Sequence, residues 1–547
     1  MKYISEDLKN AEKCELSQFF LPIEKIVAYN NVENPEFLMK REGRQADLHF
    51  EDCCNVKKGG YVVLDFGREI CGGIYITAHG VSEADNSYFR ITFGESVSEA
   101  MGRVGEDGAS NDHSPRDLTI FQPLLSHFRV GSTGFRFVKI EATTCDIQLR
   151  NVEAVLEIRD MEYKGSFICN DERLNKIWQT AAYTVQLNMQ ECMWDGIKRD
   201  RLVWIGDMHP ETSTASVVFG DTECVRRSLD FARRTPPTEW MNSIPSYSMW
   251  WIIIHYDLYM HFGNKEELFA QKDYMVTLIK RIVDNVNEDG TYKTEETPFV
   301  DWSSNKTGYE YAGFRGVRIL CLERSAEIMR IFNEPDLAEK CERAVENLKK
   351  ITEKYDGNKQ VSALVALARP DMAKEICQNV ILKNGVEGLS TFMGYYVLCA
   401  LGEQNLADSA IEIIRDFWGA MLDLGATSFW EDFDIAWTEN AARIDEIAPE
   451  GKIDVHKSYG KFCYQQHRHS LCHGWAGGPA AFMMKYVLGV RILEAGCKKV
   501  EIKPQLGNLE FVKGTFPTPY GIIEIEHKKQ GGRVVSKIIA PDGVEVV

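Results

Sequence analysis

The sequence predicts a multidomain protein in which a ring of paired helices lies between two β-domains. The chain has 547 residues, whereas a single hydrophobic core stops growing at roughly 250–300 residues. The spacing of apolar residues has the period of strands at first, changes to the period of helices near Asp171 and returns to strands after Gly496. We therefore expect a β-sandwich domain at 1–160, a helical domain at 161–494 and a small β-domain at 495–547.

The first domain is predicted from short stretches of β-branched and aromatic residues between positions 59 and 160. YVVLDF, GIYITA, YFRITF and FRFVKIEATT alternate with Gly, Asn and Asp residues. Alternation with a period of two, interrupted by turn residues, is typical of an antiparallel sandwich.

The helical domain is predicted to begin after a cap at Asn170 and Asp171, because apolar residues then fall on one helical face. Further helical patterns cover 211–234, 247–262, 265–287, 314–333, 335–355, a weaker pair between 358 and 382, 391–401, 406–422 and 478–488. The absence of a fixed sequence repeat favours hairpins closed into a ring over an open solenoid. The stretches KKVEIKP, GIIEIEH and RVVSKIIA predict the C-terminal β-domain.

Composition excludes several classes of partner. The net charge is −18, from 63 basic and 81 acidic residues, which would repel nucleic acid and anionic membranes. The first residues carry no apolar leader segment, and the 15 cysteines include no CxxC pair, so we expect a cytoplasmic protein with reduced thiols. No phosphate-binding glycine loop, dinucleotide fingerprint or GxSxG motif occurs, so we expect no cofactor.

One loop, WDGIKRDRLVWIGDMHPE at 194–211, concentrates charged and aromatic residues. It contains three aspartates, two arginines and two tryptophans within 14 residues. Such a loop can simply form surface salt bridges and cap the next helix. Tryptophans beside carboxylates are also typical of sugar sites, which combine apolar ring faces with acceptors for hydroxyl groups.

DGIKRDRLVWIGD resembles the signature loop of the α-L-rhamnosidase family, glycoside hydrolases with an (α/α)₆ toroid. Further resemblances lie in LDFGREICGG, RITFGES, PFVDWSSN, ATSFWEDFD, SLCHGWAGGP and the C-terminal KPQLGNLEFVKGTFPTPYGIIEIE. They extend from about residue 60 to the end. The resemblance implies hydrolysis of terminal α-L-rhamnosyl residues from small rhamnosides or oligosaccharides, with inversion.

The resemblance implies Glu431 as the general base, with Asp432 and Asp434 as rivals. The commoner signature has Asp-Glu before Arg-Leu, with the Glu as general acid, but here Asp200 stands alone. Either Asp200 takes the place of the acid, which we expect, or the acid is lost and the protein binds sugar without cleaving it. Inversion needs carboxyls roughly 6.5–9.5 Å apart. Because acid and base need opposite protonation states, we expect Asp200 to be more desolvated than Glu431, or nearer another negative charge.

The same resemblance implies the residues that line the rhamnose subsite: Asp195, Arg199, Trp204, Asp207, Trp250, Asp301, Trp302 and His473. Arg199 could equally be structural, paired with Asp195 or Asp207. Trp250 is chosen over its neighbour Trp251.

The cluster Cys463, His467, His469, Cys472 and His473 does not have the spacing of a structural zinc site. We therefore expect no metal ion. The expected partner is a rhamnoside, and a homodimer stays open. The alternatives are a toroid glycosidase or lyase for another sugar, which for a uronic acid needs a basic pocket, and a degenerate carbohydrate-binding protein.

Overall fold

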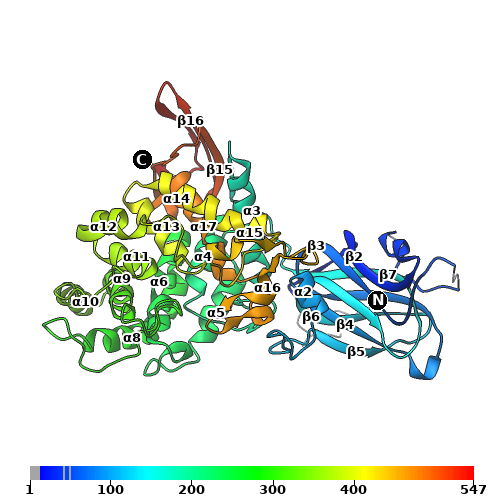
Figure 1. Cartoon of the computed structure of the whole chain (residues 1–547). Coiled ribbons are helices and arrows are strands. Elements are labelled where there is room, and N and C mark those ends of the chain that lie inside the picture. Colours follow the sequence, from blue (N-terminus) through cyan, green and yellow to red (C-terminus); the bar gives the residue numbers. More distant parts are fainter. Residues whose placement is uncertain (1–12, 41–42, 49–50) are drawn as a thin grey trace, which may run out of the picture.

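A computed structural model describes residues 13–40, 43–48 and 51–547. The N-terminal β-domain lies to one side of a large helical domain, and the C-terminal strands project from another side of that domain (Figure 1). None of the helices in these ranges is long and apolar enough to cross a membrane.

The N-terminal domain is one antiparallel sheet that curves back on itself. Its strands are β1 (Ser17–Leu21), β2 (Lys25–Glu33), β3 (Cys54–Val81), β4 (Tyr88–Gly94), β5 (Asp117–Phe121), β6 (Ser126–Ala142) and β7 (Ile147–Ile158). They follow the order β1-β7-β3-β6-β4-β5, with β2 on β3. Leu149 of β7 pairs with both Cys54 and Ala78, near opposite ends of β3. The sheet thereby encloses its own core.

The prediction missed the first two strands of this domain, which begin at Ser17 and not near residue 59. Most side chains of β2 are exposed or only half-buried. The strand therefore lacks the alternation of apolar and polar residues that marks a half-buried strand.

The helical domain, which the structure describes in full, contains 14 helices and one further short helix in a loop. They are α3 (Glu172–Asn188), α4 (Met208–Val218), α5 (Glu223–Ala232), α6 (Pro245–Phe262), α7 (Lys265–Ala270), α8 (Lys272–Asp284), α9 (Glu310–Ile331), α10 (Pro335–Leu348), α11 (Lys359–Ala368), α12 (Pro370–Ile376), α13 (Gly394–Glu403), α14 (Ala407–Ile413), α15 (Gly419–Asp423) and α17 (Gly478–Phe482), with the short α16 (Val455–Ser458) in a loop. Six of them, α4, α6, α9, α11, α13 and α17, contact one another in a closed cycle. Others pack on this cycle from outside, as α10 does on α9 and α12 on α11.

The first helix begins as predicted, because the Asp171 side chain accepts hydrogen bonds from the amides of Arg173 and Leu174. Two predicted helices are each divided in two. Gly220 has φ +82° and separates α4 from α5, a conformation that glycine adopts at little cost. Gln271 separates α7 from α8.

The C-terminal strands form two small sheets, β13-β14-β18 and β17-β16-β15-β8. They comprise β13 (Val490–Glu494), β14 (Lys499–Ile502), β15 (Phe511–Thr518), β16 (Gly521–Gln530), β17 (Arg533–Ile539) and β18 (Glu545–Val546). The second sheet also takes in β8 (Ser166–Cys169), which precedes the first helix and pairs with β15. The C-terminal domain is thus tied to the start of the helical domain.

Candidate active site

The loop at 189–207, between α3 and α4, is held against the segment that contains His473. The amide of Gly474 donates to the backbone oxygen of Asp195 over 2.8 Å, and Gly196 forms an isolated bridge with His473. The Asp195 carboxylate accepts from the amide of Leu202 at 2.9 Å, and its other oxygen lies 3.5 Å from His473 Nε2. The two sequence segments therefore form one polar cluster.

Arg199 connects both predicted catalytic carboxylates. Its Nη1 lies 3.2 Å from Asp200 Oδ1, and its Nη2 lies 2.5 Å from Glu431 Oε1. Asp200 and Glu431 therefore share one guanidinium group although they come from distant segments of the chain. Arg199 pairs with these two residues and not with Asp195 or Asp207, the partners considered from the sequence.

Glu431 is enclosed and ionised. Its side chain is 3% exposed, and its Oε2 accepts from the amide of Ser470 at 3.1 Å. Burial opposes the negative charge, but Arg199, His473 and His469 outweigh it and lower the pKa of Glu431 to about 2. Glu431 is therefore ionised and can accept a proton from water, as a weaker base than a carboxylate with a pKa near neutral pH.

Asp200 is the more accessible of the two carboxylates, with 22% of its side chain exposed. Its Oδ2 accepts from Trp204 Nε1 at 3.1 Å, and its Oδ1 lies 3.3 Å from His113 Nε2. Asp200 and Arg201 have φ values of 55° and 53°, a region costly for residues with a side chain. The expectation that Asp200 is the more desolvated carboxylate was wrong, because Asp200 is 22% exposed and Glu431 3%.

Asp195 and Asp207, two further predicted site residues, lie near a third buried acid, Glu211, which was not predicted as part of the site. Tyr247 donates its hydroxyl hydrogen to Asp207 at 3.0 Å. Burial raises the pKa of Asp195, of Asp207 and of Glu211, and neighbouring carboxylates raise the last two further. A Cβ on Gly474 would fall 2.1 Å from Glu211 Oε1, so the Glu211 side chain packs directly against this glycine. Carboxyl groups of this kind can form hydrogen bonds with sugar hydroxyls.

Asp301 and Trp302 lie in the loop between α8 and α9. Asp301 accepts from the amide of Trp302 at 2.7 Å and from the Ser303 hydroxyl at 2.6 Å. Burial, together with the charge of Asp301, raises the pKa of Asp432 to about 7, which places Asp301 close to the residue that follows Glu431. The Trp302 side chain is 39% exposed, so its ring can receive a ligand.

Trp250 lies apart from this cluster. Its ring stacks on His209 with centroids 4.7 Å apart and lies 5.0 Å from the Tyr396 ring. It lines a separate hollow of about 400 Å³, together with Asp257 and Lys485. In α6 it is Tyr247, nearer the start of the helix, that reaches the carboxylates, so the structure does not bring Trp250 together with them.

Three more aromatic or imidazole side chains complete the cluster. The Tyr464 ring lies 5.6 Å from Arg199 Cζ. Trp475 donates from Nε1 to the backbone oxygen of Glu431, and its ring lies tilted against that of His473, with centroids 4.0 Å apart. His113 comes from the β-domain. Of these, Trp475 lies in the recognised segment SLCHGWAGGP and could have been chosen, whereas no sequence signal distinguishes His113.

The histidines of the rejected zinc cluster have protein partners. His469 Nε2 accepts from the amide of Asp432 at 2.9 Å, His467 Nε2 lies 3.1 Å from the Ser98 hydroxyl, and His473 contacts Asp195. Each ring is engaged with a different protein group.

Residues 162–355 match the bacterial alpha-L-rhamnosidase 6 hairpin glycosidase domain, and residues 489–547 match the bacterial alpha-L-rhamnosidase C-terminal domain. The first half of the helical domain is therefore similar to a six-hairpin glycosidase domain. More narrowly, both matched segments are similar to domains of bacterial α-L-rhamnosidases.

Known relatives cover different parts of the chain. An alpha-L-rhamnosidase of Formosa agariphila is 26% identical over 167 residues, which are 28% of this chain and 17% of that protein. The crystal structure of the GH78 family rhamnosidase of Bacillus sp. GL1 is similar in fold, with a TM-score of 0.72 and 19% identity, over 93% of this chain and 55% of that one. A rhamnosidase of Klebsiella oxytoca with rhamnose bound has a TM-score of 0.66 and 20% identity, over 86% of this chain and 95% of that one.

Proposed function

We propose that the protein hydrolyses terminal α-L-rhamnosyl residues of small rhamnosides or oligosaccharides, with inversion, at one end of an (α/α)₆ toroid. The observation that carries this proposal is the contact of Arg199 with both Asp200 and Glu431. The closed cycle of six helices supports the toroid. The match of residues 162–355 to a bacterial alpha-L-rhamnosidase domain supports the sugar.

The sugar hydroxyls would bind to Asp195, Asp207 and His473, with Trp204 and Trp302 against the ring. The carboxylate oxygens of the two aspartates can accept hydrogen bonds, and the imidazole of His473 can donate one. This suits hydroxyl groups, which need both.

Asp200, protonated, would give its proton to the glycosidic oxygen, and Glu431 would take a proton from the water that attacks the opposite face. Arg199 approaches Glu431 more closely, at 2.5 Å against 3.2 Å for Asp200. Its charge is therefore neutralised mainly by Glu431. Asp200 makes the longer contact with Arg199 and also accepts from the indole of Trp204.

The alternative of a uronic acid substrate is less well supported. Such a substrate needs a cation for its carboxylate, but the charge of Arg199 is already balanced by two acids. A lyase or glycosidase for an acidic sugar would then have to displace one of them.

The test is release of L-rhamnose from an aryl α-L-rhamnoside, with the double variant Asp200→Asn, Glu431→Gln as the inactive control. We expect turnover by the wild type alone. Binding of rhamnose in calorimetry without any turnover would identify a carbohydrate-binding protein. Cleavage of a different aryl glycoside in preference would identify another glycosidase.

A further inference from the structure

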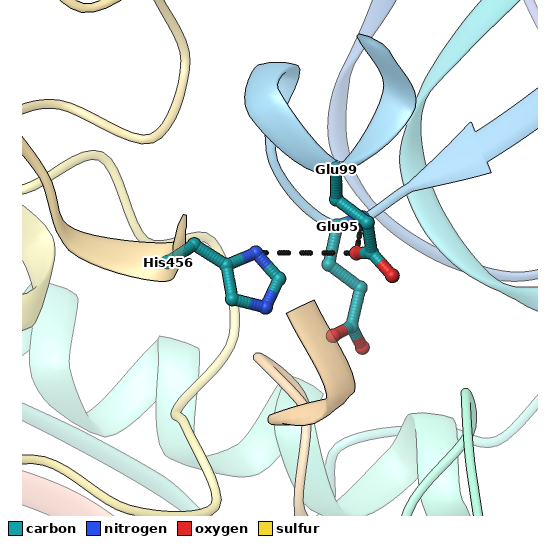
Figure 2. Close-up of side chains that lie close together, drawn as sticks. All are labelled: Glu95, Glu99 and His456. Carbon is teal, nitrogen blue, oxygen red and sulfur yellow. Dashed lines mark hydrogen bonds and ion pairs between the residues drawn. The ribbon is translucent and has the colours of Figure 1, made fainter. Parts of the chain in front are cut away.

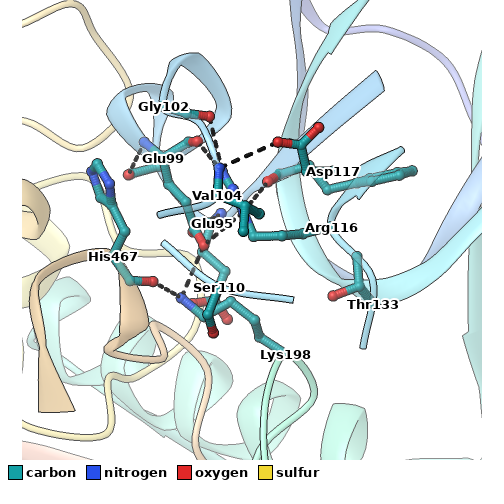
Figure 3. Close-up of polar contacts among 12 residues, drawn as sticks. Glu95, Glu99, Gly102, Val104, Ser110, Arg116, Asp117, Thr133, Lys198 and His467 are labelled. Atoms are coloured by element: carbon teal, nitrogen blue, oxygen red, sulfur yellow. Dashed lines mark hydrogen bonds and ion pairs between the residues drawn. The ribbon is translucent and has the colours of Figure 1, made fainter. Parts of the chain in front are cut away.

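A buried ionic cluster joins the β-domain to the loop that contains Arg199. Glu95 and Glu99, around the start of α2 (Val97–Met101), are 0% exposed. Lys198 Nζ lies 3.0 Å from Glu95 Oε2 and 3.2 Å from Glu99 Oε1. Figure 3 shows the lysine reaching up between the two domains toward these carboxylates.

The cluster has the donor set of a metal site, but the protein supplies the cation itself. In the described part of the chain, ligand atoms of Glu95, Glu99 and His456 lie within 4.8 Å of one another. His456 Nδ1 faces Glu99 across 3.9 Å (Figure 2). The Lys198 ammonium already contacts both carboxylates, so it balances charge that would be costly to bury unpaired.

Glu95 is connected to the general base through one residue. Its Oε1 accepts from the Ser470 hydroxyl at 3.1 Å, and its Oε2 accepts from the amide of Leu471 at 2.5 Å. Ser470 in turn donates its amide hydrogen to Glu431 Oε2 at 3.1 Å. Its carbonyl accepts from the amide of Glu431 at 3.0 Å. Through Glu95, the β-domain thus forms hydrogen bonds with the segment whose backbone binds the Glu431 carboxylate.

Lys198 makes the connection from the other side. Its Nζ donates to the backbone oxygens of His467, at 2.9 Å, and of His469, at 2.5 Å. Lys198 also directly precedes Arg199. One buried ion pair therefore fixes both the segment beside Glu431 and the loop whose arginine pairs with Glu431.

Resting on the proposed function, we propose that Glu95 of the β-domain is a positioning residue for hydrolysis, which through Ser470 and Lys198 holds Glu431 against Arg199. The β-domain is then part of the hydrolytic site and not only a neighbouring module. Glu95 touches neither the sugar nor the attacking water. Its effect should therefore fall on the rate of the chemical step and not on substrate binding.

The test compares Glu95→Gln with Asp65→Asn on an aryl α-L-rhamnoside. Asp65 is a matched control because it is also buried in the β-domain and pairs with Arg136, which contacts the helical domain at Gly425, without a link to Ser470. For Glu95→Gln we expect kcat to fall about 100-fold, the loss typical of a 1 Å misplacement, with KM within twofold. The acid limb of the pH profile should move upward, because a looser contact with Arg199 raises the pKa of Glu431. Asp65→Asn should keep kcat within threefold of the wild type and leave the pH profile unshifted.

An inactive wild type would overturn the proposed function itself. With an active wild type, an unchanged kcat and pH profile in Glu95→Gln, or an equal loss in Asp65→Asn, would overturn the inference. If Glu95→Gln does not fold, as judged by circular dichroism, Ser470→Ala serves instead, because it removes the hydroxyl link and no charge. We expect it to lower kcat about tenfold and to shift the acid limb in the same direction; no change in either would count against the inference.

Discussion

The two carboxylates on Arg199 have contrasting surroundings. Glu431 is 3% exposed and accepts from a backbone amide, whereas Asp200 is 22% exposed and accepts from an indole and contacts an imidazole. Both carboxylates contact Arg199, but Glu431 is also held by a backbone amide, whereas Asp200 lies on a left-handed turn and accepts from the indole of Trp204. The comparison thus sets an enclosed carboxylate, which we propose as the base, against an accessible one, which we propose as the acid.

The largest expected effect comes from replacing Glu431, the enclosed carboxylate. Glu431→Gln keeps the shape but removes the base, so kcat should fall about 10⁴-fold. Asp434→Asn is the control, because Asp434 lies three residues on and pairs with Lys461 at 2.6 Å; it should stay within threefold of the wild type in the same steady-state assay. An equal loss of kcat in both variants would show that Glu431 is not the general base.

Asp200→Asn should be sensitive to the leaving group. An alkyl rhamnoside needs protonation of its glycosidic oxygen, so its rate should fall about 10³-fold, against about tenfold for a nitrophenyl rhamnoside. The ratio of kcat/KM for the two substrates measures this difference. Identical losses on both would mean that Asp200 is not the acid.

Arg199→Met should shift the acid limb of the pH profile, which depends on the ionisation of Glu431. The pKa of Glu431 is held at about 2 partly by Arg199, so its loss raises that pKa and moves the acid limb of kcat/KM to higher pH. In the wild type the depressed pKa stabilises the fold above the ordinary pKa of glutamate, about 4.3, and this stabilisation is lost as the pH falls toward 2. The variant should lack this acid-side loss, but at pH 7 its buried unpaired carboxylate should cost about 3–5 kcal/mol.

Arg201→Met is the control for charge removal in the same loop. Arg201 lies over the Trp194 ring, at 4.4 Å, and donates to the Ser132 carbonyl. We expect no shift of the acid limb in this variant. A shift as large as that of Arg199→Met would mean that general loosening of the loop, and not the ion pair, sets the pKa of Glu431.

The smallest expected effect lies at Trp302, whose exposed ring borders the cluster. Trp302→Ala should raise KM about tenfold, equivalent to about 1.4 kcal/mol, and leave kcat within twofold. Trp302→Phe, which keeps an aromatic face, should recover most of the loss. A fall in kcat with unchanged KM would contradict a purely binding role.

Much of the site was predictable because its residues cluster locally in the sequence. Asp195, Arg199, Asp200 and Asp207 lie in one loop, and the start of α3 followed from the Asp171 cap. Such signals need only the order of neighbouring residues.

Other features depend on how distant elements meet. Nearly every side chain in the first three turns of α6 is buried, so no polar face showed that Tyr247 and not Trp250 points to the carboxylates. His113 and Glu95 reach the site from the β-domain, and local periodicity does not encode how two domains pack. The backbone at Asp200 was likewise not predictable. Its φ of 55° is left-handed, and no residue in the loop indicates such a turn.

Proton NMR of the sugar first released from an aryl α-L-rhamnoside tests the central claim most directly. If Asp200 protonates the leaving oxygen while Glu431 activates water on the opposite face, β-L-rhamnose must form first and only later equilibrate with its anomer. Initial release of α-L-rhamnose would mean that water does not attack from the side of Glu431, and would contradict the assignment of the two carboxylates.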